Sequence, residues 1–214
     1  MARQLRKPSG LFGRFVLPRR LSRINVTLNE ATLAALDLQP DDRVLEVGFG
    51  PGDLIARIEP LVPCGSVSGA DFSPEMVAVC AKRFKDATRS GRVHLECASA
   101  EALPFGDGCF TKACTVNTLY FWSDPAVALV EFGRVLAESG RLVLTFSPRA
   151  TMQSLVVAEH GFTLYDPDEI RVLLQDAGFG DINMIPGEGP HGEFLCATAV
   201  KPRASREMGE ATQS

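Results

Sequence analysis

The sequence contains no apolar run of the ~18 residues that a membrane-spanning helix needs. Its basic N-terminal segment has no continuous apolar stretch followed by a cleavage site, so we expect no secretory signal. Composition is otherwise ordinary, with 45% hydrophobic and 22% charged residues in a chain of 214. These features predict one globular domain located in the cytoplasm.

The chain also lacks the spacings of metal centres and disulfide frameworks. Its six cysteines form no C-x-x-C pair, and its three histidines are far apart, with no i, i+4 pair. Most of the cysteines lie in apolar stretches, which is typical of buried free thiols in a reducing compartment. We therefore predict neither a metal site nor a disulfide.

Acidic residues are missing from the first part of the chain. Residues 1–29 carry seven Lys or Arg and no acid, whereas the remainder carries 15 basic and 26 acidic residues. Such a basic arm can bind nucleic acid or anionic lipid, and residues 1–24 could make a peripheral membrane contact. We favour a third reading, in which the arm folds back as a lid on its own acidic domain. The acidity of that domain counts against nucleic acid as a partner.

Strand-like and helix-like segments alternate along the chain, which is typical of an α/β fold. Prolines preceded by Ser or Asp mark several helix starts. Helices are expected over 25–38, 51–61, 73–88, 124–137 and 166–178, with an irregular or short helical insertion at 148–165. Strands are expected over 43–47, 66–71, 93–97, 110–116, 141–146, 179–185 and 193–200.

The last two strands are joined only by the Pro- and Gly-containing segment 186–192, which predicts an antiparallel hairpin at one sheet edge. The expected fold is an α/β, Rossmann-like three-layer sandwich with a mostly parallel seven-stranded sheet and a C-terminal antiparallel hairpin. We expect a single domain over 41–201. A basic arm and lid helix precede it over 1–40, and a disordered tail follows over 202–214.

Three glycines follow the first expected strand at alternate positions, namely Gly48, Gly50 and Gly52. Glycine tolerates positive φ and lets a ligand approach the backbone, so this turn predicts a nucleotide cradle. A dinucleotide fingerprint, G-x-G-x-x-G, would need its third glycine at Asp53. This departure disfavours an NAD-dependent oxidoreductase, because a carboxylate suits an ammonium or sulfonium better than a diphosphate.

Two further motifs follow the glycines along the chain. Ser66-Val67-Ser68-Gly69-Ala70-Asp71 places a carboxylate at the end of the second strand, about 20 residues past the first glycine, where such folds hold a ribose. The third motif is Ala98-Ser99-Ala100-Glu101-Ala102-Leu103-Pro104-Phe105. With V-L-E-V-G-F-G-P-G at residues 44–52, these segments resemble the class I S-adenosylmethionine-dependent methyltransferases, in particular their type 11 group. The resemblance covers residues 40–147.

The resemblance implies S-adenosyl-L-methionine as the cofactor and assigns roles to residues of the three motifs. The glycines would line the methionine and ribose, Glu46 would accept from the ammonium, and Asp71 would hold both ribose hydroxyls. Ser99 stands where the family usually has Asp, so the adenine would be read more by the backbone of Ala100. The residues so implied in cofactor binding are Glu46, Gly48, Phe49, Gly50, Gly52, Asp71, Phe72, Ser99, Ala100, Glu101 and Asn117.

The segment Asn117-Thr118-Leu119-Tyr120-Phe121-Trp122 follows the fourth strand, where the family's acceptor faces the methyl group. It is not the N-P-P-[YF] motif that grips a planar amine. We name Asn117 and Tyr120 as candidate catalytic residues. Tyr120, Trp122, His160 and Tyr165 are the candidate acceptor-binding residues.

The predicted function is methyl transfer to a small-molecule acceptor by in-line displacement. The alternatives are an RNA or membrane-lipid methyltransferase that uses the basic arm, and a cofactor-binding protein without catalysis. The sequence identifies neither the acceptor nor the oligomeric state.

Overall fold

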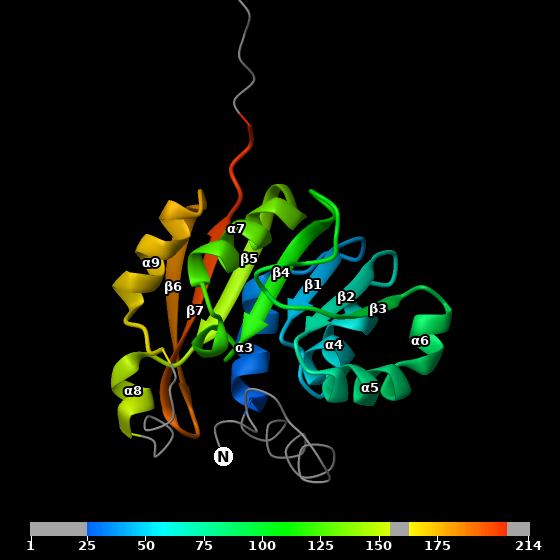
Figure 1. Cartoon of the computed structure of the whole chain (residues 1–214), viewed down its shortest axis with the longest axis horizontal. Coiled ribbons are helices and arrows are strands. Elements are labelled where there is room, and N and C mark those ends of the chain that lie inside the picture. The colour runs from blue at the N-terminus through cyan, green and yellow to red at the C-terminus, as the bar shows by residue number, and fades with distance from the viewer. Residues whose placement is uncertain (1–24, 155–162, 205–214) are drawn as a thin grey trace, which may run out of the picture.

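The computed structural model describes residues 25–154 and 163–204, and their seven strands form one sheet of order β3-β2-β1-β4-β5-β7-β6 (Figure 1). Strands β1 to β5 pair with one another in parallel, whereas β7 runs antiparallel between β5 and β6. The predicted mostly parallel seven-stranded sheet with a C-terminal hairpin is therefore confirmed. The strands are β1 (Arg43–Val47), β2 (Ser66–Asp71), β3 (Val93–Cys97), β4 (Phe110–Val116), β5 (Leu136–Phe146), β6 (Gly180–Gly189) and β7 (Gly192–Val200).

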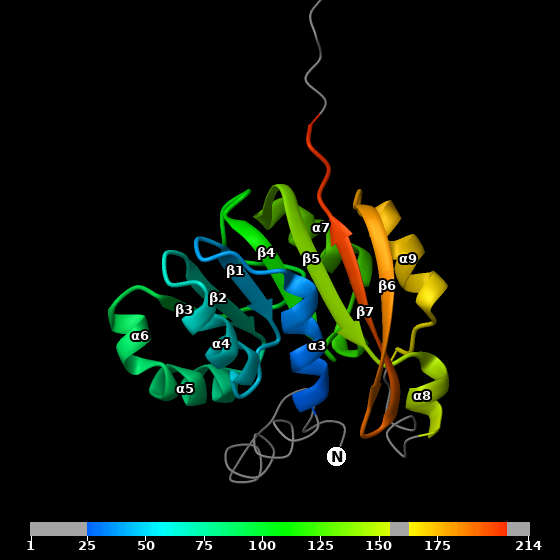
Figure 2. The same cartoon turned by 180° about the vertical axis from the view of Figure 1, so that it is seen from behind.

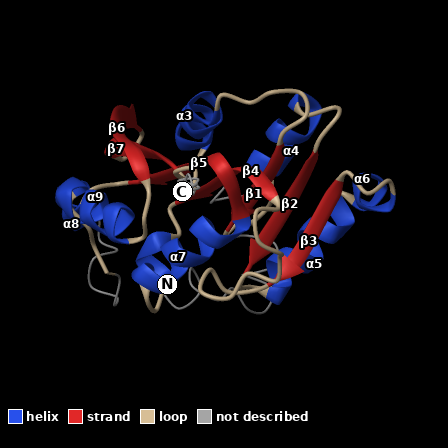
Figure 3. Ribbon diagram, turned by 90° about the horizontal axis from the view of Figure 1, so that it is seen from above, coloured by secondary structure: helices blue, strands red, loops and turns tan. Residues whose placement is uncertain are grey.

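Helices cover both faces of the sheet, which makes three layers (Figure 3). One apolar cluster joins the sheet to α3, α4 and α5, and the other joins it to α7 and α9. The helices are α3 (Val26–Leu36), α4 (Asp53–Ile58), α5 (Pro74–Arg83), α6 (Lys85–Arg89), α7 (Pro125–Val135), α8 (Arg149–Ser154) and α9 (Pro167–Asp176), with short 3-10 helices η2 (Glu59–Leu61) and η3 (Leu119–Phe121). Among the described residues, no helix is long and apolar enough to cross a bilayer.

Capping residues fix where three of these helices begin. The Ser73 side chain accepts from the third helical residue of α5, and the Asp124 side chain accepts two backbone N–H bonds at the start of α7. Asp166 and Glu169 form a reciprocal capping box on α9. Proline occupies the first turn of each helix, where its missing N–H costs nothing. The predicted starts of these helices are confirmed.

Strand β5 is longer than predicted and begins at Leu136, immediately after α7. Leu136 pairs with Phe110, and Arg141 pairs with Lys112, so the residues between them form an irregular bulge. Sequence patterns located only the regular part after this bulge. At the far end of the chain, residues 202–204 hydrogen bond back to this bulge through Arg203 and Ala204.

The β6–β7 hairpin also extends beyond the predicted strands. Pairing continues to Gly189 and Gly192, which leaves Pro190 and His191 as a two-residue turn. Pro186 is tolerated inside β6 because β6 is an edge strand. The predicted loop over 186–192 is thus mostly strand, and it carries the turn to the carboxyl ends of the parallel strands (Figure 1).

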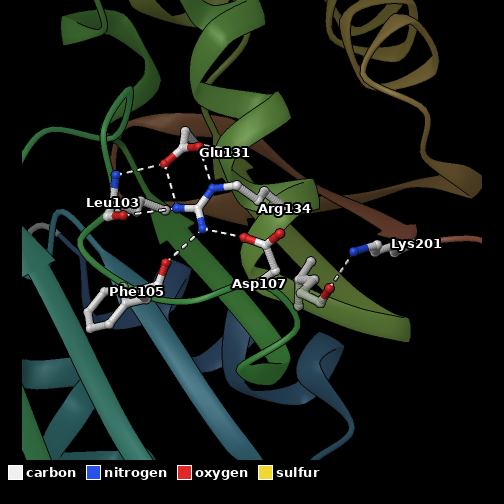
Figure 4. A network of polar contacts seen from close by, with 7 residues as sticks. Leu103, Phe105, Asp107, Glu131, Arg134 and Lys201 are labelled. Atoms are coloured by element: carbon white, nitrogen blue, oxygen red, sulfur yellow. Dashed lines mark hydrogen bonds and ion pairs between the residues drawn. The ribbon is translucent and has the colours of Figure 1, made fainter.

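The connection between β3 and β4 contains no helix and is fixed by Arg134 of α7 (Figure 4). The guanidinium donates to the carbonyl oxygens of Leu103 and Phe105 at 2.9 and 2.7 Å, and to Asp107 at 2.8 Å. Glu131 binds the same guanidinium through both carboxylate oxygens and accepts from the Leu103 N–H. This network holds the loop whose first residues reach the site described next.

Candidate functional site

A cavity of about 510 Å³ opens at the carboxyl ends of the parallel strands, a size typical of small-molecule sites. Its walls come from the β1–α4 loop, the end of β2, the loop after β3 and the η3 segment. The first turn of α3, helix α8 and the β6–β7 turn also line it. Twelve predicted site residues line the cavity: Glu46, Gly48, Phe49, Gly50, Asp71, Phe72, Ser99, Ala100, Glu101, Asn117, Tyr120 and Trp122.

The glycines of the β1–α4 loop, which we call the glycine loop, are required for different structural reasons. Gly48 has φ of 76°, and a Cβ there would lie 2.2 Å from Thr118 Cγ2, so the residue brings the β1 and β4 loops together. Gly52 has φ of 79° and is the N-cap of α4, and a Cβ there would meet Cys80 of α5 and Phe84, the residue that ends α5. Gly52 does not line the cavity, in contrast to the prediction, because the loop turns its α-carbon into the core.

Asp71 ties the end of β2 to the glycine loop. Its Oδ2 accepts from the Gly50 N–H and its Oδ1 accepts from the Ser73 N–H, both at 2.8 Å. Burial raises the pKa of Asp71, and these two N–H groups oppose the shift. Each carboxylate oxygen has a further lone pair, so the side chain remains able to accept from ligand hydroxyls in the cavity.

Glu46 is buried at the end of β1, and its Oε2 has no hydrogen-bond partner among the described residues. Burial raises the pKa of Glu46 well above the ordinary 4.5, and the nearby charge of Asp71 raises it further, against a backbone N–H from Ile55. An unsatisfied buried oxygen on a residue that lines a cavity indicates a missing ligand donor. A cationic donor such as an ammonium fits it, because it would also stabilise the charged form.

Ser99 and Glu101 are engaged with each other in the loop after β3. The Ser99 hydroxyl donates to Glu101 Oε2 and accepts from the Glu101 N–H. Glu101 Oε1 accepts from the Ser123 N–H at 2.7 Å and thereby ties this loop to the start of α7. Burial raises the pKa of Glu101, but the bonds from Ser99 and the backbone outweigh it and lower the pKa overall. The Glu101 carboxylate therefore positions the loop.

Asn117 adopts a left-handed conformation with φ of 55°, which Asn tolerates better than most residues. Its Nδ2 donates to Asn25 Oδ1 at 3.0 Å, and its Oδ1 lies 3.3 Å from the Tyr120 hydroxyl. That hydroxyl also accepts from the Ser147 N–H at 2.6 Å and lies 3.0 Å from the Ser147 carbonyl oxygen. Burial raises the pKa of Tyr120, so the phenol is neutral and positions Asn117 and Ser147.

The aromatic residues divide between cavity and core. Both Phe72 and Phe49 line the cavity, but Phe72 is 52% exposed whereas Phe49 is buried with its ring over Gly69. Trp122 lines the cavity and packs on Phe132 with ring centroids 5.8 Å apart. Tyr165, expected in the acceptor wall, is instead buried in the core beside α7 and α9. His160 lies outside the described residues.

The lining residues that the sequence did not point to include Asn25, Asn29, Met152 and His191. They come from the start of α3, from α8 and from the hairpin turn, whose position at the site depends on long-range packing. The two-residue turn could have been found only by placing β7 beside β5. The predicted buried thiols are found for Cys80, Cys114 and Cys196, whereas Cys64, Cys97 and Cys109 are exposed. Within the described ranges, no cluster of His, Cys, Asp or Glu is arranged to hold a metal ion.

The sequence is similar to those of known methyltransferases. Residues 45–144 match the family model described as a methyltransferase domain. The chain is 38% identical over 103 residues to a ubiquinone/menaquinone biosynthesis C-methyltransferase, UbiE, of Geobacter sp. (strain M21), covering 48% of this chain and 44% of that protein. It is 29% identical over 185 residues to the uncharacterized methyltransferase YdaC of Bacillus subtilis (strain 168), covering 83% and 93%.

The fold is also similar to that of a solved methyltransferase structure. The solved structure of an S-adenosylmethionine-dependent methyltransferase from Aquifex aeolicus superposes with a TM-score of 0.70 and 21% identity, covering 86% of this chain and 97% of that one. The chain spans less than half the length of the Geobacter relative. The glycine loop, Asp71 and the loop after β3 all lie within the matched segment. These matches support a class I, S-adenosylmethionine-dependent methyltransferase, the family that the three motifs predicted.

Proposed function

We propose that this protein transfers a methyl group from S-adenosyl-L-methionine to a small-molecule acceptor by in-line displacement. The observation that carries the proposal is the unsatisfied Oε2 of Glu46, a residue that lines the same cavity as the glycine loop and the buried Asp71. A cation bearing ribose hydroxyls matches both carboxylates at once. The cofactor supplies the electrophilic methyl group, and the protein supplies binding and orientation.

The residues present fit this cofactor. Glu46 would accept from its ammonium, and the free lone pairs of Asp71 would accept from the ribose hydroxyls. The backbone at Ala100 would border the adenine, since the Ser99 hydroxyl is already bonded to Glu101. Asn117, fixed by Tyr120 and Asn25, would hold the reacting end in place. Such fixed groups lower the barrier by orienting the acceptor in line with the breaking bond.

The side of the cavity formed by α3, η3 and α8 favours a neutral and largely apolar acceptor. Leu28, Phe121, Trp122 and Met152 contribute apolar surface there. The described lining contains four carboxylates and no Lys or Arg, which leaves His191 as its one basic side chain and makes it a poor site for a phosphate. This composition supports a small organic acceptor over a nucleic acid, because binding of nucleic acid depends on cationic contacts to phosphates.

Calorimetry with S-adenosylmethionine and S-adenosylhomocysteine tests the proposal. We expect the wild type to bind both and Asp71→Ala to lose about 1.5–3 kcal/mol of binding free energy, the range for hydrogen bonds to a charged group. Asp86→Asn removes an exposed carboxylate far from the cavity and should bind like the wild type. A folded wild type that binds neither ligand would move the non-catalytic alternative into first place.

The roles of the basic arm stay predictions, because residues 1–24 lie outside the described part of the chain. A cytoplasmic location likewise remains part of the proposal. The three readings of the arm differ in what its deletion removes. Loss of vesicle flotation points to anionic lipid, loss of salt-sensitive RNA binding points to nucleic acid, and a change in turnover alone points to a lid.

A further inference from the structure

Asn29 is a buried polar residue that the fold itself does not use. It lies in the second turn of α3, is 6% exposed and lines the cavity. Its backbone N–H bonds to the Asn25 carbonyl as in any helix, but its side-chain amide has no hydrogen-bond partner among the described residues. The fully buried side-chain atoms without a partner among the described residues are Glu46 Oε2 and Asp53 Oδ2, so the Asn29 amide is instead open to the cavity, where a ligand can bond to it.

Two polar residues on the same face as Asn29 are engaged with the rest of the fold. Asn25 accepts from Asn117, and the Thr32 hydroxyl bonds to the Leu28 carbonyl and to Thr145 of β5. Asn29 lies between them on the same inward face of the helix. Asn is also a poorer helix former than Ala or Leu, so the helix gains nothing from it. The amide is therefore directed to something that enters the cavity.

The position of α3 shows on which side of the cavity Asn29 lies. The helix packs over β4 and β5, whereas the motif residues for the cofactor follow β1, β2 and β3 (Figure 2). The adjacent Leu28 reaches the hairpin turn, with its Cδ1 3.5 Å from the position of a Cβ on Gly189. Asn29 thus lies on the side formed by α3, η3, α8 and the hairpin turn, where the acceptor would sit.

We propose that Asn29 is a specificity-determining residue, whose amide hydrogen bonds a carbonyl or hydroxyl oxygen of an otherwise apolar methyl acceptor. The inference rests on the proposed function, because it assumes that the cofactor fills the opposite side. Nδ2 can donate to a carbonyl, and Oδ1 can accept from a hydroxyl, so one residue reads either group. A buried amide of this kind also rejects analogues that lack the oxygen, since the amide would then stay unpaired.

Matched probe pairs test the inference without knowledge of the natural acceptor. The probes are 1-naphthol against naphthalene and acetophenone against ethylbenzene, added to protein saturated with S-adenosylhomocysteine. Trp122 is the single tryptophan of the chain and lines the cavity, so its fluorescence reports binding. The variants are Asn29→Leu, which removes the amide at similar size, and Glu30→Gln, which changes an exposed residue on the other side of α3.

We expect the wild type and Glu30→Gln to prefer the oxygen-bearing probe of each pair by about tenfold or more, and Asn29→Leu to lose that preference. Affinity of Asn29→Leu for S-adenosylhomocysteine should stay within about twofold of the wild type. The inference is overturned if Asn29→Leu weakens S-adenosylhomocysteine and leaves probe preference intact, or if no oxygen-bearing probe binds the loaded wild type. Failure of the wild type to bind S-adenosylhomocysteine would instead refute the proposed function.

Discussion

The side chains of Asn25 and Asn117 are joined by a hydrogen bond of 3.0 Å across 92 residues of sequence. Asn25 stands at the N-cap of α3, yet its side chain makes no capping bond and binds the β4 loop instead. The amide of Asn117 is thereby fixed from two sides, by Asn25 and by Tyr120. The residue at the start of α3 therefore helps to position Asn117 in the cavity wall.

A double-mutant cycle on this pair measures the link. Asn25→Ala and Asn117→Ala should show a coupling of about 0.5–1.5 kcal/mol in the free energy of unfolding, the usual net value of one hydrogen bond. Asn25→Asp keeps an oxygen acceptor and should preserve the coupling. Purely additive effects in urea denaturation would show that the bond contributes nothing.

Glu46→Gln should separate stability from binding. The folded-state pKa of Glu46 lies well above the ordinary 4.5. The neutral Glu46 carboxyl therefore stabilises the fold fully below pH 4.5. This part of the free energy of unfolding is lost as pH rises through the folded pKa, because the buried group must then ionise. Gln mimics the protonated form, so the ligand-free variant should melt at a higher temperature than the wild type at pH 7 and lose this part of the pH dependence. Binding of S-adenosylmethionine should weaken, since the ammonium loses a charged partner.

The matched control for Glu46→Gln is Glu96→Gln, which changes an exposed residue of β3 outside the cavity. It should alter neither the melting temperature at pH 7 nor cofactor affinity. A Glu46→Gln protein that is less stable than the wild type at pH 7 would mean that the buried carboxylate is compensated in a way the described contacts do not provide.

Gly48→Ala and Gly91→Ala compare two glycines with nearly equal φ, 76° and 75°. Gly91 has open space around its α-carbon, so its substitution should cost about 1 kcal/mol of unfolding free energy from backbone strain alone. Gly48→Ala adds a clash with Thr118 Cγ2 and should cost more and impair cofactor binding. Thr118→Ser removes that methyl group and should restore part of the loss, as measured by denaturant titration.

Arg134→Met should loosen the β3–β4 connection. The guanidinium satisfies two carbonyl oxygens and two carboxylates, so we expect a loss of about 2 kcal/mol or more in unfolding free energy. Arg89→Met breaks an exposed ion pair with Asp86 and should cost less than about 1 kcal/mol. Because the loop carries Ser99, cofactor affinity should fall in the first variant and stay constant in the second.

The cofactor side was predictable from the sequence because its residues directly follow strands. In a parallel sheet the carboxyl ends of strands meet at one edge, so Glu46, Gly50 and Asp71 could be placed together without knowing the rest of the fold. The acceptor side depends on how separate elements pack. Asn29 looks like any polar helix residue. Tyr165, the last residue of the expected insertion, is buried in the core because it packs with residues of α7 and α9.

The insertion of β7 between β5 and β6 has a consequence for synthesis of the chain. Until residues 192–200 have emerged, β5 has no partner on one side, and its apolar residues Leu142, Val143 and Leu144 form an open sheet edge. Such an edge is a template for aggregation. The nascent protein is therefore most vulnerable just before its last strand pairs, and the same event that closes the sheet delivers the hairpin turn to the cavity.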